Sequence, residues 1–342
     1  MSKQVVLTGL RTNAEYHLGN YLGALLPMVD MAQNRAGDYQ VNIFAPDLHS
    51  FTTPIGFSKF HEQTMHNLKL FVACGFPLDH EDVFMYRQSH VPAHSELAWI
   101  LSNFTGFGEM SRMVEFKDKS ERIGNDRVSV GLFSYPILMA ADILLYGATY
   151  IPVGEDQRQH LEFTRDIAMR MNNQFGELFV VPETLENQQK FVERESAPRI
   201  RSLRDPSKKM SKSVDDPSGT ILLSDNPDEA RKKVMRAETD NVGTIHFNWD
   251  NQPGITNLLQ MLALLTHRPQ SEIIAEWEDK ERYGDLKSAV ADAVVAILEE
   301  IQANMAKVSD EELLAKLESS EAEMNKQANQ TLLKIQKAVG LR

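Results

Sequence analysis

Two things that this sequence has little of limit what the chain can be: cysteine and long apolar runs. Among its 342 residues is a single cysteine, Cys74, which excludes a disulfide framework and a cysteine-built metal site. Cys74 ends an apolar helical pattern, so we expect a buried thiol that packs as a small residue. No apolar run approaches the roughly 20 residues that a membrane-spanning helix needs. We therefore expect a globular protein with no membrane partner.

A surplus of positive charge is lacking too. The formal net charge is −12 at pH 7, which argues against indiscriminate binding to DNA or other nucleic acid, because affinity for a polyanion comes mainly from neutralising its phosphates. Two local basic stretches remain, one from 194 to 212 and one from 231 to 236. Each fits a solvated surface and an RNA contact about equally well. The first strand pattern follows Lys3 almost directly, which predicts no signal peptide and a cytoplasmic location.

The first half of the chain alternates short β-rich runs with helical patterns. Strands are predicted at Val5–Leu7, Val41–Ala45, Val83–Tyr86 and Tyr150–Val153, and helices at Gly19–Ala32, Phe57–Cys74, Ala93–Phe104, Tyr135–Tyr146 and from near Glu155. This alternation predicts an α/β, Rossmann-like parallel sheet with helices on both faces. In such sheets, ligands bind beyond the carboxyl ends of the strands.

The pattern of apolar and polar residues changes after residue 213, where few segments have the character of strands. Helical patterns cover Pro227–Arg236, Ile255–Leu265, Gln270–Trp277, Lys287–Met305 and Asp310–Val339. We expect a catalytic domain at 1–206 with a helical insertion around 93–135, a mobile loop at 207–217, and a C-terminal all-helical region at 218–342. The last helix of that region can pack back on the catalytic domain.

Two short motifs carry the chemistry, His17-Leu18-Gly19-Asn20 and Lys209-Met210-Ser211-Lys212-Ser213. The first follows an apolar strand and opens an amphipathic helix, whose N-terminus attracts phosphate through its backbone N–H groups and its partial positive charge. The second puts two lysines on a polar segment, where they act as mobile point charges for phosphate. Each motif alone also fits a helix cap or a solvated loop. Together they predict an enzyme that handles a nucleoside triphosphate.

The pair of motifs resembles the signatures of the class I aminoacyl-tRNA synthetases. Three further segments are similar to the bacterial tryptophanyl-tRNA synthetase family, so that the resemblance covers nearly the whole chain: Tyr135–Leu144, Val153–His160 and Pro253–Leu258. It implies ATP-dependent attachment of L-tryptophan to tRNA(Trp) through a tryptophanyl-adenylate, with release of AMP and pyrophosphate. It also implies Mg²⁺, a homodimer, and C-terminal helices that receive the anticodon.

The resemblance implies an ATP site built from both motifs and the loops between them. Its expected residues are Arg11, Thr12, Asn13, Gly19, Asn20, Gly154, Glu155, Asp156, Ile200, Lys209, Met210, Ser211, Lys212 and Ser213. Catalytic roles are implied for His17, Asn20, Lys119, Lys209 and Lys212. Gly19 would leave room for adenine, and Ile200 would hold the base through its main chain. Because the sequence shows no carboxylate cluster for a protein-built metal cage, Mg²⁺ would be held mainly by phosphates and water.

The reaction explains these residue types. A tryptophan carboxylate is already ionised at neutral pH, so it needs no general base to attack the α-phosphorus of ATP. Catalysis is then mostly positioning and stabilisation of charge on the phosphates. A site supplied with lysines and backbone amides, and without a nucleophilic triad, fits that requirement.

Asp142 interrupts an otherwise apolar helical run from Ile137 to Tyr146. A buried carboxylate is costly unless a group donates to it, and an indole N–H is such a donor. An aspartate on the helix surface or paired with an arginine is the alternative; the resemblance favours the ligand role. Tyr135 and Met139 share its helical face and could wall the indole ring.

Three further positions complete the tryptophan site that the resemblance implies. Gln157 and His49 would reach the ammonium or carboxylate end of tryptophan. Leu7 stands near the substrate at a position that is often aromatic in the family. His160 fits a structural histidine equally well and receives no role.

The chain departs from the family just before its first motif. Thr12-Asn13-Ala14 replaces Pro, then Ser or Thr, then Gly, and Arg11 replaces a neutral residue, so the loop before the first motif offers ATP different side chains and an added positive charge. Three other functions stay open: a tyrosine-specific enzyme of the same architecture, a small nucleotidylyltransferase, and a catalytically silent paralogue that binds RNA or a protein. Intact Gly19, Lys209 and Lys212 argue against the last.

Overall fold

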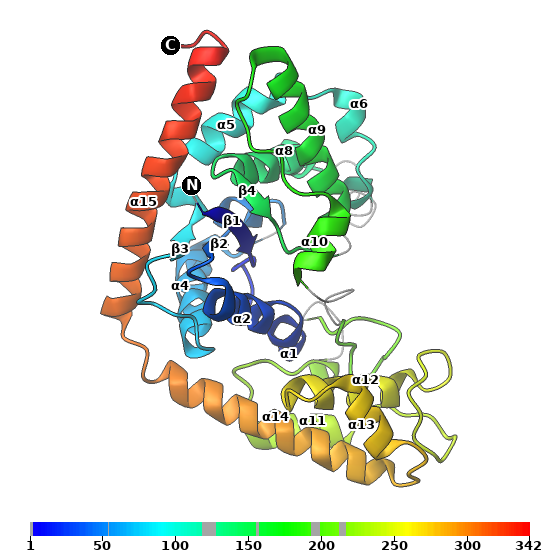
Figure 1. The fold of residues 1–342 in the computed structure, drawn as a ribbon. Helices are drawn as coiled ribbons and strands as arrows, with labels where there is room; N and C mark the ends of the chain where they lie inside the picture. The colour runs from blue at the N-terminus through cyan, green and yellow to red at the C-terminus, as the bar shows by residue number, and fades with distance from the viewer. Residues whose placement is uncertain (1–2, 54, 118–127, 155–156, 193–198, 212–216) are drawn as a thin grey trace.

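Four parallel strands form the sheet of the N-terminal part (Figure 1). The computed structural model describes residues 3–53, 55–117, 128–154, 157–192, 199–211 and 217–342. Strand order is β3-β2-β1-β4, with β1 at Gln4–Gly9, β2 at Tyr39–Ala45, β3 at Val83–Arg87 and β4 at Ala148–Tyr150. Val41 pairs with Val6 of β1 and with Val83 of β3. The predicted α/β parallel sheet is confirmed.

The fourth strand lies earlier than the sequence predicts. It was expected at Tyr150–Val153, but β4 ends at Tyr150. The N–H of Ile151 donates to the side-chain oxygen of Gln188 at 2.8 Å, and Pro152 has no N–H to donate. The ladder therefore cannot continue, although the apolar run does.

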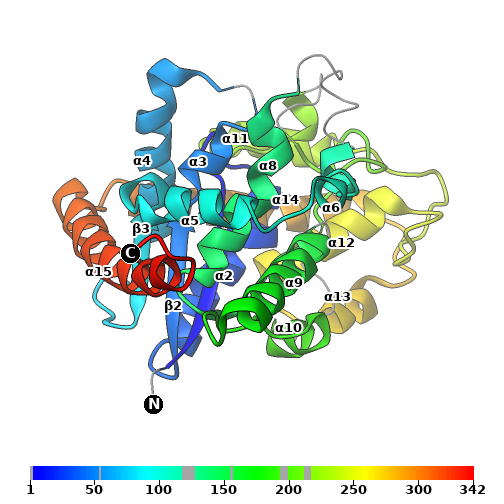
Figure 2. The ribbon, with the colours of Figure 1, turned by 90° about the horizontal axis from the view of Figure 1, so that it is seen from above.

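Helices cover both faces of the sheet (Figures 1 and 2). Their bounds are α1 Leu18–Asn20, a π-helical turn Tyr21–Leu25, α2 Leu26–Arg35, α3 Asp47–Ser50, α4 Phe57–Ala73, a 3₁₀ turn Gln88–His90, α5 Ala93–Ser102, α6 Phe107–Met110, α8 Val130–Leu144, α9 Arg158–Phe175 and α10 Leu185–Val192. Neighbouring residues of β2 point to opposite faces: Ile43 joins the cluster with α2 and α4, and Phe44 joins the cluster with α5, α8 and α9. This is the period-2 pattern of a sheet buried on both sides.

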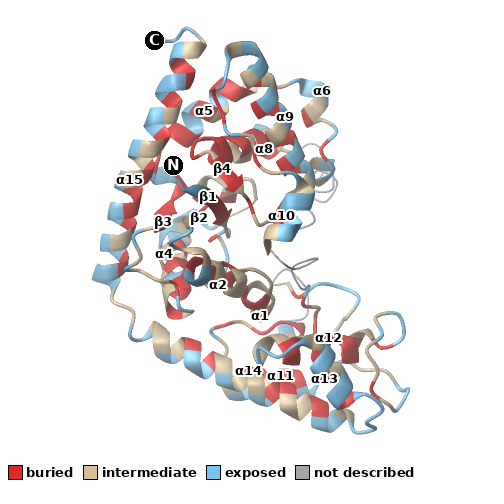
Figure 3. Ribbon diagram, in the orientation of Figure 1, coloured by how far each residue is buried: buried red, intermediate tan, exposed pale blue. Residues whose placement is uncertain are grey.

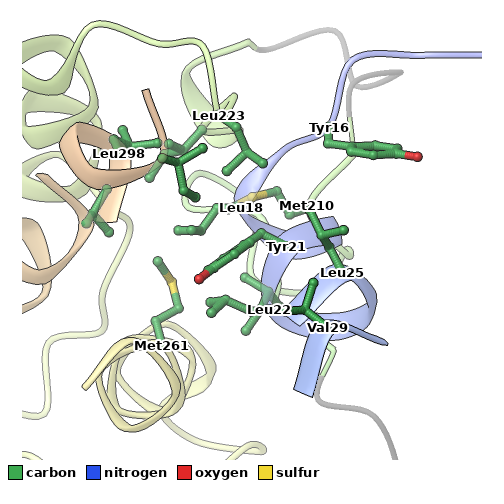
Figure 4. Packing of buried hydrophobic residues seen from close by; sticks show 14 of the residues in the cluster. Tyr16, Leu18, Tyr21, Leu22, Leu25, Val29, Met210, Leu223, Met261 and Leu298 are labelled. Atoms are coloured by element: carbon green, nitrogen blue, oxygen red, sulfur yellow. The ribbon is translucent and has the colours of Figure 1, made fainter. Parts of the chain in front are cut away.

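The C-terminal part is helical, as predicted. After a 3₁₀ turn at Pro217–Gly219 come α11 Pro227–Met235, α12 Pro253–Leu265, α13 Gln270–Trp277, α14 Tyr283–Met305 and α15 Asp310–Ala338. Helix α14 packs on α11, α12 and α4. One apolar cluster runs from the first helix into this part, joining Leu22 to Met261 and Leu298 (Figure 4).

The last helix covers the open edge of the sheet. Strand β3 is an edge strand, and its outward N–H groups bond to α15: Met85 N–H to Ser320 Oγ at 3.2 Å and Arg87 N–H to Glu321 Oε1 at 3.2 Å. The Arg87 guanidinium forms a two-bond ion pair with Glu321, 2.6 Å from Nε to Oε1 and 2.8 Å from Nη2 to Oε2. Side chains of α15 thus satisfy donors that an edge strand would otherwise present to another chain.

Burial follows the helical period along the C-terminal helices. In Figure 3 the buried positions of α14 and α15 form a stripe, and their exposed positions lie on the outside.

Among the described residues, no helix combines the length and the apolar character needed to cross a bilayer. Cys74 is only partly buried, although burial raises the pKa of its thiol to about 12.

Candidate functional site

The first motif caps the helix that it opens. His17 is the N-cap residue of α1: its Nδ1 accepts from the N–H of Asn20 at 3.2 Å, and its own N–H donates to Asn20 Oδ1 at 3.1 Å. This reciprocal pair is a capping box built from histidine and asparagine instead of serine and glutamate. The π-helical turn that follows is a feature often found at functional sites. His17 and Asn20 are therefore held in fixed directions at a helix N-terminus.

Residues next to the second motif pair with the first motif. The N–H of Leu18 donates to the carbonyl of Ile221 at 2.8 Å, and the N–H of Leu223 donates to the carbonyl of Tyr16 at 3.0 Å. A Cβ added to Gly19 would lie 3.4 Å from Cβ of Met210. Figure 4 shows Met210 in one apolar group with Leu18. The structure thus brings together two segments that lie almost two hundred residues apart in the sequence.

His17 is held neutral at physiological pH. Burial, and secondly the positive charge of Lys209, lower the pKa of its imidazole to about 4. Because Nδ1 accepts a hydrogen bond from Asn20, the neutral ring carries its proton on Nε2. His17 can therefore donate one hydrogen bond without placing a charge beside Lys209.

The segment that precedes the lysine motif folds back on it through an isolated antiparallel bridge between Arg201 and Lys209. Met210 N–H donates to the carbonyl of Ile200 at 2.9 Å, and Ser202 N–H donates to that of Lys208 at 2.9 Å. Thr220 Oγ1 donates to the carbonyl of Ser211 at 2.9 Å and holds the other end. Ile200, Lys209, Met210 and Ser211 thus belong to one compact unit.

The departure at residues 12 to 14 is compensated by α4. Thr12 is fully buried, with its hydroxyl 3.0 Å from that of Thr64. Asn67 donates to the carbonyls of Thr12 at 3.0 Å and Ala14 at 2.9 Å, and Asn13 donates to Thr53 Oγ1 at 3.1 Å. The side chains of Thr12 and Asn13 hold the turn, so an ATP contact from Thr12 would have to come from its backbone. Arg11 is exposed.

Asp142 is the centre of a buried polar cluster. Its side chain is buried, and three donors reach its carboxylate: Gln88 Nε2 at 2.7 Å and His94 Nδ1 at 2.6 Å on Oδ1, and His49 Nε2 at 2.8 Å on Oδ2. Burial by itself raises the pKa of this carboxyl, but the bonds from His49 and His94 outweigh it and lower the pKa below its usual range. Of the alternatives weighed from the sequence, neither a surface aspartate nor an arginine partner is what the structure shows.

Two members of this cluster, Gln88 and His94, were missed by the sequence reasoning. Gln88 directly follows the last residue of β3 and His94 lies on the first turn of α5. The rule that ligands gather beyond the carboxyl ends of parallel strands points to the segment after β3 as it did to Asp47–His49. His49 itself was expected at the polar end of tryptophan; the structure places its Nε2 on Asp142.

The other residues of the expected tryptophan site come from three elements, α8, β1 and the start of α9. On α8, Tyr135 is buried and Met139 partly buried. The Tyr135 hydroxyl lies 2.7 Å from His160 Nε2, which gives His160 a supporting position. Leu7 is buried on β1, and Gln157 is the N-cap residue of α9, its N–H bonded to the carbonyl of Gly154 at 2.9 Å.

Five expected site residues lie outside the described residues: Lys119, Glu155, Asp156, Lys212 and Ser213. Within the described ranges, a single group of three possible metal ligands occurs, His246, Glu278 and Asp279, in the C-terminal helical part. The described residues near the two motifs supply no such group. A divalent ion there would take its ligands mainly from phosphate and water, which is how Mg²⁺ is commonly bound.

The basic stretch on α11 is mostly ion-paired. Arg231 pairs with Asp292 at 2.5 Å, Lys232 with Glu229 at 2.6 Å, and Lys233 with Asp225 at 2.6 Å. Cations that already have acidic partners add less to binding a polyanion. Of the two readings of residues 231 to 236, the structure favours a charged surface.

Comparison with known proteins agrees with this geometry. The family model described as tRNA synthetases class I (W and Y) matches residues 2–299. The tryptophan–tRNA ligase of Caldanaerobacter subterraneus is 43% identical over 336 residues, covering 98% of both chains, and that of Corynebacterium efficiens is 45% identical over 87% of this chain and 82% of its own. These relatives are named for tryptophan, in agreement with the segments around Asp142.

Solved structures give the same answer. The tryptophanyl-tRNA synthetase of Mycoplasma pneumoniae superposes with a TM-score of 0.84 at 31% identity, covering 99% of this chain and 98% of its own. The tryptophanyl-tRNA synthetase of Campylobacter jejuni, complexed with ADP and tryptophan, superposes with a TM-score of 0.76 at 30% identity. The superposition covers 98% of this chain and 100% of that one. A tyrosyl-tRNA synthetase of Aeropyrum pernix shares the fold alone. It is 17% identical, and the superposition has a TM-score of 0.69 and covers 94% of this chain and 90% of that one. This chain therefore belongs to the class I tRNA synthetases of the W and Y family, on the side of the tryptophan–tRNA ligases.

Proposed function

We propose that the protein attaches L-tryptophan to tRNA(Trp) in two steps, with tryptophanyl-adenylate as the intermediate. The observation that carries this proposal is the contact between the two motifs: Gly19 faces Met210, and Leu18 is bonded to Ile221. A helix N-terminus and a lysine-bearing segment thereby meet at the carboxyl edge of a parallel sheet, where a triphosphate can be bound from both sides. Charging of tRNA also places the enzyme in the cytoplasm.

ATP takes its contacts from both motifs in this proposal. The Nε2–H of neutral His17 and the side chain of Asn20 face the phosphates, and the backbone at Gly19 lets adenine approach closely. Ile200 binds adenine through its main chain, supported by the bond from Met210 N–H to its carbonyl. Lys209 and Lys212 follow the pyrophosphate, with Lys119 assisting. Contacts from Arg11, Thr12, Asn13, Gly154, Glu155, Asp156, Ser211 and Ser213 complete the site.

Mg²⁺ accompanies ATP and shares the charge of its phosphates. The described residues fit that arrangement, because they offer lysine and backbone donors at this edge and no cluster of carboxylates. The protein itself supplies orientation and positive charge.

Tryptophan lies with its indole N–H toward Asp142. The ionised carboxylate accepts that proton donor, Tyr135 and Met139 of α8 and Leu7 of β1 flank the ring, and Gln157 serves the polar end. His49, which was expected at the polar end, is bonded to Asp142 Oδ2 and so belongs to the indole end. A substrate without an N–H at this point leaves a buried acceptor unpaired, which penalises phenylalanine.

The chemistry then needs positioning more than proton transfer. A tryptophan carboxylate oxygen forms a bond to the α-phosphorus while the bond to the β-phosphate bridging oxygen breaks and pyrophosphate leaves. A terminal ribose hydroxyl of the tRNA next attacks the carbonyl carbon of the adenylate, and AMP leaves with the bonding electrons while the hydroxyl proton passes to its phosphate. Lysine and N–H donors stabilise the charge that moves to the leaving phosphates in the first step.

We place tRNA against the C-terminal helices, with the anticodon received by the region 218–342. A homodimer is supported by exposed apolar side chains on α5, α6 and the start of α8. Trp99, Phe107 and Val130 are 73, 76 and 81% exposed, and the rings of Phe107 and Phe133 lie 5.2 Å apart. Large apolar side chains gathered on one surface mark an interaction site. A second copy of the chain is the partner that the family implies.

Amino-acid-dependent exchange of pyrophosphate into ATP tests the function. Run across all twenty amino acids, it should respond to tryptophan alone. Exchange driven by tyrosine would replace this proposal with its closest rival. Absence of exchange with every amino acid, from folded protein, would favour a silent paralogue. Transfer of labelled tryptophan to tRNA(Trp) then tests the second step.

A further inference from the structure

The two oxygens of the Asp142 carboxylate have different surroundings. Oδ1 takes two bonds, from Gln88 and His94, whereas Oδ2 takes one, from His49. A carboxylate offers about four lone-pair positions, about two on each oxygen. Among the described residues, two donors bond to Oδ1 and one to Oδ2, so Oδ1 has less capacity left for a further donor. Any further donor is directed to the Oδ2 side.

The orientation of Gln88 follows from its other bond. Its Oε1 accepts the N–H of Leu48 at 3.2 Å, so its NH₂ group must be the atom that faces Asp142. The Gln88 NH₂ group therefore donates a hydrogen bond to Asp142, and Oδ1 is the acceptor.

The imidazole ring of His94 is held in place by burial and by contacts with aromatic rings. Its side chain is completely buried. Its ring stacks on Phe44 and Tyr86, with centroids 6.4 and 6.2 Å away and interplanar angles of 18° and 29°. The ring therefore has one orientation, with Nδ1 toward Asp142 and Nε2 toward the Tyr146 hydroxyl, 2.9 Å away.

Tyr146 sets which nitrogen of His94 carries the proton. Burial raises the pKa of Tyr146 far above its usual value, so the group remains a hydroxyl and can donate to Nε2. A neutral imidazole that accepts at Nε2 carries its proton on Nδ1. That proton points at Asp142 Oδ1, and the chain Tyr146, His94, Asp142 has one consistent direction of donation.

We propose that His94, fixed by Tyr146, is a positioning residue for amino-acid selection: it locks Oδ1 of Asp142 so that Oδ2 is presented, ionised and correctly directed, to the indole N–H. This inference rests on the proposed function, in which Asp142 accepts that proton donor. Without the bond from His94, the buried carboxyl can rotate or take up a proton. A protonated carboxyl carries a donor and is a weaker acceptor, so it selects less strongly for N–H.

Substrate analogues separate this role from simple support of the fold. The probe is L-3-(benzothiophen-3-yl)alanine, which replaces the indole N–H by sulfur and keeps the size of the ring. The measured quantity is the ratio of kcat/KM for tryptophan to that for the analogue in ATP–pyrophosphate exchange. We expect Tyr146→Phe and His94→Gln to lower this ratio by about tenfold, the value of a hydrogen bond to a charged group. KM for ATP should stay near that of the unmodified protein.

Tyr39→Phe is the matched control. It also removes one tyrosine hydroxyl next to the sheet, but Tyr39 lies at the start of β2 and packs on Tyr150 and Phe191. Its ratio should not change. An equal loss of activity toward tryptophan and the analogue in Tyr146→Phe and His94→Gln would show a merely structural role and overturn the inference, as would an unchanged ratio.

A measurement on the unmodified protein keeps the inference testable if both variants fail to fold. Nitrogen-15 NMR distinguishes the two tautomers, and the inference requires His94 protonated on Nδ1; a proton on Nε2 alone would overturn it. Asp142→Ala separates this inference from the proposed function. Suppose that Asp142→Ala lowers the ratio of kcat/KM for tryptophan to that for the analogue, while His94→Gln and Tyr146→Phe leave this ratio unchanged. Then only the role of His94 is wrong. If Asp142→Ala retains the ratio, the indole acceptor is wrong.

Discussion

Asn257 binds the main chain of Arg201 in both directions. Its Oδ1 accepts the N–H of Arg201 at 2.8 Å and its Nδ2 donates to the carbonyl of the same residue at 3.1 Å. Asn257 is buried on α12, so a helix of the C-terminal part fixes the backbone beside Ile200. The segment proposed to bind adenine is therefore anchored to α12 by two hydrogen bonds.

Replacing Asn257 should weaken ATP more than tryptophan. Asn257→Ala removes two bonds to the segment that carries Ile200, and we expect KM for ATP to rise by about tenfold. KM for tryptophan should change little, because Asp142 and its partners lie on other elements. Exchange kinetics at varied ATP and varied tryptophan measure both. Asn251→Ala, at an exposed asparagine of the same region, is the control; equal rises in both KM values for Asn257→Ala would contradict the division.

Asp142→Ala should damage tryptophan use specifically. The change removes the proposed acceptor for the indole N–H and leaves Gln88, His94 and His49 without their common partner. We expect kcat/KM for tryptophan to fall by about ten- to a hundredfold or more, with ATP binding retained. Calorimetric titration with tryptophan and with ATP, in separate experiments, checks this. Retained tryptophan affinity together with weakened ATP binding would be the contrary outcome.

The pKa of His17 provides a test that needs no substrate. In NMR titrations its imidazole should titrate near pH 4, against an ordinary value of 6.5. Lys209→Met should raise the pKa only part of the way toward 6.5, because burial is the larger cause and Lys209 the smaller. An unchanged value would mean that Lys209 does not face His17.

The same group makes stability depend on pH in a defined window. As the pH falls below 6.5 the unfolded chain takes up a proton at His17, while the folded protein does so only near pH 4. The contribution of His17 to unfolding free energy therefore decreases from about pH 6.5 downward and levels off below about pH 4. Chemical denaturation of the protein and of His17→Asn at several pH values isolates this contribution by difference.

Breaking the ion pair under the last helix should destabilise the fold strongly. Arg87 and Glu321 are both buried, and removing one partner of a buried pair leaves an uncompensated charge, at about 3–5 kcal/mol. Arg87→Met should therefore lower the unfolding free energy more than the double variant Arg87→Met/Glu321→Leu. Lys326→Ala, which breaks a more exposed pair with Glu323 on the same helix, should have a much smaller effect. A double variant less stable than Arg87→Met would count against this account.

The proposed dimer surface can be tested by charge. Trp99→Glu places a charge among these exposed apolar side chains and should convert the proposed dimer to monomer in light scattering after size exclusion. Val242→Glu alters another exposed apolar residue, outside that surface, and should leave the mass unchanged. A monomeric mass for the unmodified protein would refute the surface as an interface.

Local patterns were sufficient to predict most of the fold. The period of apolar residues located β1, β2 and β3 and the C-terminal helices to within a few residues. It failed at β4, because an apolar run does not reveal that Ile151 bonds to a side chain or that Pro152 interrupts the ladder. The π-helical turn at Tyr21–Leu25 was also beyond such patterns, because the period of apolar residues does not distinguish it from an α-helical turn.

The site was predicted unevenly. His17 and Gly19 stand in motifs whose chemistry is local, and the structure places them beside Met210. Asp142 was identified by its polarity within an apolar run. Its partners were not, because Gln88 and His94 reach it from 54 and 48 residues away. Such contacts are set by topology, and only the rule about strand ends indicates where to look for them.

The cover that α15 provides for β3 has a consequence for synthesis on the ribosome. Met85 leaves the peptidyl-transferase centre 235 residues before Ser320, its partner, an interval on the order of ten seconds or more at ordinary elongation rates. Throughout that time the nascent sheet presents an unpaired border to neighbouring polypeptides. Truncated translation products that end before residue 310 should therefore be the species that chaperones capture and that aggregate in the cell.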